Sequence, residues 1–152
     1  VFGGGSTSRL YRSLVVENGI AAAAGAYYGG TTLDDSRFVI YASPRPGHSL
    51  ADMEKALDAE LARLIKDGVQ PGEFERAKTR LIADTIYDLD SQASLARTFG
   101  SALTTGMDIK SVLEWPERIR AITADQLVEV AKRVLVMRQS VTGLLESAPE
   151  AA

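Results

Sequence analysis

Residues 1–30 read VFGGGSTSRLYRSLVVENGIAAAAGAYYGG, and this stretch decides the fold. Three consecutive glycines free the backbone, and Ser6 or Thr7 can then cap a helix, because a hydroxyl oxygen accepts a hydrogen bond from an N–H of the first turn. Leu10, Leu14 and one of the two valines that follow recur at helical spacing. This periodicity predicts a short helix with one buried face.

The helix is expected over residues 6–18, and two strands are expected to follow it. Gly19 suits the left-handed position that ends a helix. Residues 20–28 are mostly alanine and glycine, so another backbone can approach this strand closely. Residues 37–43 are rich in aromatic and β-branched side chains and predict a second, antiparallel strand.

The remainder of the chain predicts a run of helices and one further strand. The patterns Ser49-x-x-Asp52 and Thr123-x-x-Gln126 are typical of helix N-termini, and Pro71 suits the first turn of another helix. Residues 139–145 alternate well enough for a final strand. The order of elements predicts an α+β fold, in which an antiparallel sheet carries helices packed on one face.

Composition excludes several classes of protein. The chain has 152 residues, 45% of them hydrophobic and 24% charged, which fits one globular domain. A net charge of −3 offers no basic stripe for nucleic acid, and no apolar run is long enough to span a membrane. Cysteine is absent, which removes disulfides and thiolate chemistry and is compatible with either cytoplasm or periplasm.

Few side chains suggest catalysis or metal binding. A zinc site needs three or four converging donors, and the only histidine, His48, lies in a loop before a predicted helix. The pairs Asp34-Asp35 and Asp88/Asp90 fall at a turn and at a helix break, where capping explains them better than acid–base catalysis. We therefore predict no catalytic residue and no bound metal in this chain.

The three glycines could in principle cradle a phosphate in front of a helix. However, no lysine follows them as in a Walker loop, and no strand with G-x-G-x-x-G spacing precedes them. A flexible turn is the interpretation that the pattern favours.

The stretch GGGSTSRLYRSLVVENGIA resembles the glycine-rich segment, helix and strand of the second, non-catalytic half-domain of pitrilysin-like zinc peptidases. This family includes insulin-degrading enzyme, the mitochondrial processing peptidases and many bacterial relatives. The segments DDSRFVIYASPRPG, GVQPGEFERAKTRLI and ITADQLVEVAKRVL are similar to later parts of the same half-domain and occur in the same order. The resemblance covers nearly the whole chain.

The resemblance implies that residues 1–146 form a partial C-terminal half-domain, without the family's N-terminal strand and helix, and that residues 147–152 form a flexible tail. The parent protein would be a bacterial zinc metalloendopeptidase, periplasmic or cytoplasmic, that hydrolyses enclosed peptides. Its zinc motif, His-x-x-Glu-His, would lie in the missing N-terminal half-domain. This chain would form the non-catalytic wall of the chamber, bind no zinc itself and join a related subunit as a homo- or heterodimer.

Many family members carry an Arg and a Tyr, seven residues apart, that hold the substrate backbone. By resemblance these positions fall on Val15 and Ala22, and neither side chain can do that work. This departure suits two-chain members, in which one subunit carries the zinc and the other the Arg and Tyr. The candidates that would face substrate are Gly3, Gly4, Gly5, Val15 and Ala22.

Two other interpretations stay open. The chain could belong to a non-catalytic scaffold or partner subunit of the same fold, and the presence or absence of His-x-x-Glu-His upstream would distinguish the two. A weaker alternative is an unrelated α+β binding domain whose small-residue strand, residues 20–30, pairs with a partner strand.

Overall fold

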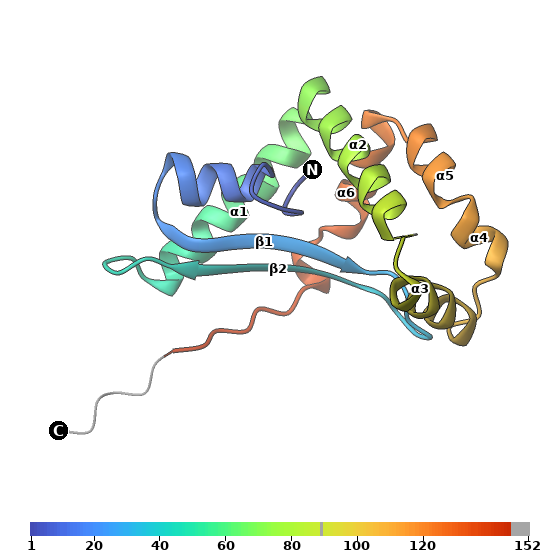
Figure 1. Ribbon diagram of the computed structural model, residues 1–152. Coiled ribbons are helices and arrows are strands. Elements are labelled where there is room, and N and C mark those ends of the chain that lie inside the picture. The colour runs from blue at the N-terminus through green and yellow to red at the C-terminus, as the bar shows by residue number, and fades with distance from the viewer. Residues whose placement is uncertain (89, 147–152) are drawn as a thin grey trace.

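The computed structural model describes residues 1–88 and 90–146 and shows an α+β arrangement (Figure 1). The predicted fold class is confirmed. The elements in chain order are η1 (Tyr11–Glu17), β1 (Ala21–Gly29), β2 (Arg37–Pro44), α1 (Leu50–Asp67), α2 (Pro71–Asp88), α3 (Gln92–Thr104), α4 (Ile109–Leu113), α5 (Trp115–Ala121), α6 (Ala124–Val134) and η2 (Met137–Gln139).

The sheet is one antiparallel hairpin of β1 and β2, as the sequence predicts for its first two strands. The cross-strand pairs Ala24–Ala42 and Ala26–Ile40 point to the side where the helices lie, because these residues belong to the hydrophobic core or pack against it. Figure 1 shows η1 and α2 above the hairpin in this view, with α1 crossing it.

The prediction of a third strand over residues 139–145 is wrong. Met137–Gln139 form a single 3₁₀ turn, and residues 140–146 have no regular secondary structure. A strand exists only through its neighbour, and no described strand pairs with this segment. Apolar alternation alone therefore does not fix a strand.

The first helix also differs from its prediction. Helical backbone begins at Arg9, and neither Ser6 nor Thr7 caps it. Backbone carbonyls accept these hydrogen bonds instead. The N–H of Ser8 donates to the carbonyl of residue 5, that of Arg9 to residue 1, and that of Leu10 to residue 2. The glycine segment folds back and thus provides hydrogen-bond acceptors for the first N–H groups of the helix, for which a side-chain hydroxyl was expected.

The core lies between η1, the hairpin and α1. Leu10, just before η1, and Leu14 within it are fully buried, and Met53 and Leu64 of α1 are nearly so. Alanines of β1 form the floor of this cluster. The small side chains predicted to allow close approach thus let η1 pack directly on the strand.

Both predicted capping boxes are present. The Ser49 hydroxyl accepts from the backbone N–H of Asp52, whose carboxylate accepts from the Ser49 N–H at 2.9 Å. Thr123 and Gln126 make the same reciprocal pair at the start of α6. Among the described residues no helix is long and apolar enough to cross a lipid bilayer.

We expect Ser49→Ala to lower the free energy of unfolding by about 1 kcal/mol, because the first turn of α1 loses its side-chain cap. The hydrogen bonds from Ser49 lower the pKa of the Asp52 carboxyl below its ordinary value of 3.8. The charged box therefore stabilises the fold above that value and loses this contribution as the pH falls through the lowered pKa. Urea titrations should show the deficit at neutral pH and a smaller deficit in acid.

The matched control is Ser101→Ala, an exposed serine within α3. Alanine is the better helix former, so this variant should be neutral or slightly more stable. An equal loss in both variants, or a deficit of Ser49→Ala that does not change with pH, would contradict the proposed cap.

Candidate functional site

The glycine segment lies between β1 and α2, and Gly3 makes the contact with the strand. The Gly3 carbonyl accepts a hydrogen bond of 3.0 Å from the N–H of Ala26. A Cβ atom at Gly3 would collide with the backbone of Gly25 and Ala26. Glycine is therefore required here by close backbone approach.

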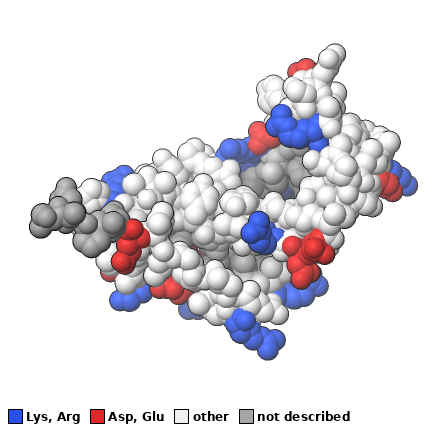
Figure 2. Space-filling model, turned by 90° about the horizontal axis from the view of Figure 1, so that it is seen from below, with Lys and Arg blue, Asp and Glu red and all other residues white. Residues whose placement is uncertain are grey.

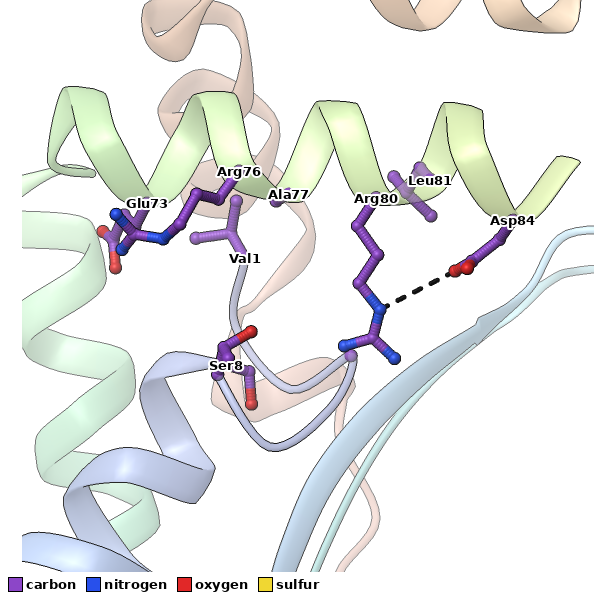
Figure 3. A pocket seen from close by; sticks show the side chains of 10 residues that line it. Val1, Ser8, Glu73, Arg76, Ala77, Arg80, Leu81 and Asp84 are labelled. Carbon is purple, nitrogen blue, oxygen red and sulfur yellow. Dashed lines mark ion pairs between the residues drawn. The ribbon is translucent and has the colours of Figure 1, made fainter. Parts of the chain in front are cut away.

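Gly5 makes the contact with α2. Its φ of +141° is a conformation that side-chain-bearing residues rarely adopt, and a Cβ atom would meet the guanidinium of Arg80. Figure 3 shows Arg80 reaching from α2 to the loop before η1, with Asp84 at 3.7 Å as its ion-pair partner. The segment is thus enclosed on both sides.

Gly4 differs from its two neighbours. No described atom lies within 4 Å of the position that its Cβ would take, and the residue is exposed. It lines a cavity of about 100 Å³ together with Ser8, Arg76 and Arg80 (Figure 3). Of the three predicted substrate-facing glycines, Gly4 is the one that presents backbone to open space.

Arg9 holds the helix η1 against the turn between α1 and α2. Its guanidinium donates to the Gly68 carbonyl at 2.9 Å and forms an ion pair with Glu73. Glu73 also accepts from the N–H of Gln70 at 2.9 Å, which caps the start of α2. One arginine thus joins η1 to both long helices.

A second polar contact joins η1 to α1. The Ser13 hydroxyl donates to Glu60 Oε1 at 2.7 Å, and Glu60 is only 4% exposed. Arg63 lies 3.2 Å from the same carboxylate. These groups, with Arg9 and Glu73, line a second cavity of about 250 Å³ in which positive and negative side chains are interspersed. Such interspersed charges are typical of contacts between helices.

Val15 and Ala22, the positions assigned by resemblance to the substrate-binding Arg and Tyr, have different surroundings. Val15 is 8% exposed and belongs to the core, whereas Ala22 is exposed on β1. The Val15 carbonyl accepts from the Arg45 guanidinium at 3.4 Å. A role of either residue toward substrate stays a prediction.

The donor chemistry of the chain does not fit zinc. His48 is exposed in the loop before α1, and the described residues contain no group of three His, Cys, Asp or Glu side chains that could hold a metal ion. Cysteine is absent from the sequence. A tetrahedral zinc site therefore has too few donors here.

The free face of the hairpin is the largest feature that sequence reasoning did not single out. Tyr27 and Tyr41 project from it, both more than half exposed, and the Tyr41 ring lies over Gly25. Arg37 is the one charged residue within the two strands. Figure 2 views the molecule from below and shows broad uncharged areas between scattered Lys, Arg, Asp and Glu on that side. Alternation within residues 37–43 could have revealed this face.

Comparison with known proteins identifies the family. Residues 1–81 match the family model described as the peptidase M16 inactive domain. The chain belongs to the peptidase M16 family. The predicted resemblance to the non-catalytic half of these zinc peptidases is thereby confirmed.

Relatives of this M16 inactive domain are zinc proteases of bacteria. The chain is 29% identical over 140 residues to an uncharacterised zinc protease from Streptomyces coelicolor, covering 92% of this chain and 30% of the relative. It is 26% identical over 146 residues to the zinc protease PqqE from Helicobacter pylori, covering 96% and 32%. The chain thus spans about a third of the length of these relatives.

Solved structures share the fold of this M16 domain. The inactive peptidase domain of a protein described as a zinc protease from Bordetella parapertussis superposes with a TM-score of 0.82 at 20% identity, covering 96% of this chain and 78% of that one. A protease from Helicobacter pylori gives 0.79 at 25% identity, covering 87% and 32%.

Proposed function

We propose that this chain is the non-catalytic wall of a chamber in which a zinc metalloendopeptidase hydrolyses enclosed peptides. The match of residues 1–81 to the inactive domain of the M16 family carries the proposal. Residues 1–146 would form a partial C-terminal half-domain, and the missing N-terminal half-domain would be its partner. Residues 147–152, expected to be a flexible tail, lie outside the described residues.

The free face of the hairpin supports a wall that contacts peptide. It combines exposed tyrosine rings with alanine and glycine, and it has few charges. Aromatic rings and small residues offer area to apolar and backbone groups of an extended peptide without selecting for charge. Gly4, with its open surroundings, would lie at the edge of this contact surface.

Zinc would belong to the parent enzyme and not to this chain. The sequence has one histidine and no cysteine, and residues 1–88 and 90–146 contain no group of three donors that could hold a metal ion. No catalytic step is therefore assigned to the residues of this chain, whose role is to bind and enclose.

A second candidate is a partner subunit that is itself inactive. By resemblance Val15 and Ala22 stand where many family members have the Arg and Tyr, and neither side chain can make the same hydrogen bonds to a substrate backbone. Such a chain needs another subunit to supply those two side chains. Zinc content of the full-length protein separates the candidates, because a pure scaffold would hold none.

We expect the 152-residue chain alone to give no turnover of a quenched fluorescent peptide, with or without added zinc. The full-length protein, which would include the N-terminal half-domain, is expected to cleave the same peptide and to lose activity with a chelator. Turnover by the isolated chain that a chelator abolishes would contradict the assignment, and so would a full-length protein that is inactive beside every related subunit.

The wall itself is tested by Tyr27→Ala in the full-length protein. This change should lower kcat/KM for an extended peptide about threefold or more and leave a truncated peptide unaffected, because only the longer chain reaches the hairpin. Tyr87→Ala is the matched control, since Tyr87 is also well exposed, 74% against 57% for Tyr27, but lies on α2. Equal effects of the two variants would contradict a substrate role for the free face.

A further inference from the structure

The junction between η1 and β1 holds the one asparagine of the sequence, Asn18, directly before Gly19. Asparagine is a labile residue, because the backbone nitrogen of the next residue can attack its side-chain amide, and a glycine offers no side chain to hinder that attack. Asn18 is exposed, and Gly19 has a φ of +64° outside any regular element. The junction is therefore open to solvent and outside the hydrogen-bond ladder of a helix or strand.

The nitrogen that would attack is also free of a hydrogen bond. Among the described residues no acceptor takes the N–H of Gly19. The comparable pair Asp67-Gly68 at the end of α1 differs, because the N–H of Gly68 donates to the Leu64 carbonyl at 3.1 Å, although its φ of +71° is close to that of Gly19. Attack requires loss of this proton, which a hydrogen bond opposes. The structure thus separates two junctions that look alike in sequence.

The side-chain amide of Asn18 belongs to a chain of hydrogen bonds that joins η1 to α1. Its Nδ2 donates to Ser13 Oγ at 3.3 Å, and the Ser13 hydroxyl donates to Glu60 Oε1 at 2.7 Å. A hydroxyl has a single hydrogen, which Glu60 takes here, so Ser13 can only accept from residue 18. A neutral amide supplies the donor, whereas an ionised carboxylate has none.

We propose that Asn18 is a modification site, at which spontaneous deamidation breaks this connection between η1 and α1. The Gly19 nitrogen loses its proton to solvent and bonds to Asn18 Cγ, the amide nitrogen leaves as ammonia, and a cyclic succinimide results. Water then opens the ring at either carbonyl and leaves aspartate or isoaspartate. The net reaction consumes water and releases ammonia, so that it requires no enzyme and no cofactor.

The product carboxylate lies in surroundings that suit an amide. Ser13 would stand between two carboxylates with one hydrogen to share, and Glu60 is only 4% exposed, so solvent screens their repulsion weakly. The N–H of Asn18 bonds to the Ser13 carbonyl at the end of η1, where negative charge is unfavourable. The Arg45 guanidinium, 3.5 Å from the place of a Gly19 Cβ, offsets part of this cost. Isoaspartate also lengthens the backbone here. Both products should therefore loosen η1.

The first test follows residue 18 in the full-length protein during incubation at physiological temperature and neutral pH. Trypsin releases residues 13–37 as one peptide, in which mass spectrometry detects the replacement of the amide by an acid. We expect aspartate and isoaspartate to accumulate there. The matched control is Asp67→Asn, which places the same asparagine–glycine pair at the end of α1. Its amide should convert several times more slowly than that of Asn18 in the folded protein and at a similar rate in urea.

The second test measures the consequence in the full-length protein with Asn18→Asp, which imitates one product. Hydrogen–deuterium exchange of the η1 amides should become about threefold faster or more, the effect of losing one hydrogen bond from this helix. Asn18→Gln is the control, because it keeps a neutral donor, and its exchange should stay near that of the native protein.

Three outcomes would each overturn the proposal. The first is a residue 18 that keeps its amide in the folded protein while protein unfolded in urea loses it. The second is equal conversion at positions 18 and 67 in folded Asp67→Asn. The third is the same exchange of η1 in Asn18→Asp and Asn18→Gln.

Discussion

Gly3→Ala should lower the free energy of unfolding by about 1–3 kcal/mol, the usual cost of forcing an extra carbon into a packed site. The new Cβ would collide with the backbone of Gly25 and Ala26, which cannot move aside as a flexible side chain can. The hydrogen bond from the Ala26 N–H to the Gly3 carbonyl would stretch or break as well. Urea titration monitored by circular dichroism measures the loss.

Gly4→Ala is the matched control in the adjacent position. Its Cβ would project into open space, so stability should change by no more than about 0.5 kcal/mol. Gly5→Ala should fall between the two, because Arg80 can swing away but a φ of +141° stays unfavourable for alanine. Equal losses at Gly3 and Gly4 would show that the strand contact does not decide the need for glycine.

This pattern bears on the meaning of the three glycines. The sequence favours a flexible turn over a phosphate cradle, and the resemblance implies glycines that face substrate. The structure gives each glycine different surroundings: Gly3 against β1, Gly5 against Arg80, and Gly4 toward a cavity. The segment is therefore a packed connection in which one position, Gly4, faces an open cavity.

Elements with local signals were predictable from sequence. The capping boxes at Ser49 and Thr123 each need only residues three apart, and both are found where they were predicted. The hairpin was also predictable, because its strands are adjacent in sequence and pair directly with each other. The family was recognised in the same way, from short segments in a fixed order, and the comparison with known domains agrees.

Elements that depend on distant partners were not predictable. The segment after Gln139 has strand-like residues but no described strand beside it, so its conformation depends on what covers it. The cap of the first helix comes from carbonyls of residues 1, 2 and 5, which requires the glycine segment to fold back. Alternation within residues 37–43 marks Tyr41, but that Tyr27 lies on the same face follows only from the register of the hairpin.

Sequence alone also could not decide which of Val15 and Val16 is buried. Neither valine lies three, four or seven residues from Leu10 or Leu14, so an ordinary helical repeat could not show which of them is buried. The residues Tyr11–Glu17 form a wider π-helical turn, and the N–H of Asn18 bonds to the Ser13 carbonyl five residues back. This widening places Val15 in the core and leaves Val16 64% exposed.

Leu14→Ala should therefore destabilise the chain by about 2–5 kcal/mol, the range for deleting a leucine from a packed core. Leu14 is fully buried against the alanines of β1, and those small residues cannot expand to fill the space it leaves. A loss of this size is a large part of the total stability of a domain. Chemical denaturation followed by tryptophan fluorescence of Trp115, together with circular dichroism, measures it.

Two valine variants decide whether the π-helical turn sets the buried face. Val15→Ala should cost about 1–3 kcal/mol and Val16→Ala no more than about 0.5 kcal/mol, because only Val15 lies in the core. An ordinary helix rotated by one residue would reverse this order, so a larger loss at Val16 would contradict the wide turn. Val15 stands, by resemblance, at the position of the family's arginine, so the experiment also tests whether its side chain is needed in the core to hold η1 on the sheet.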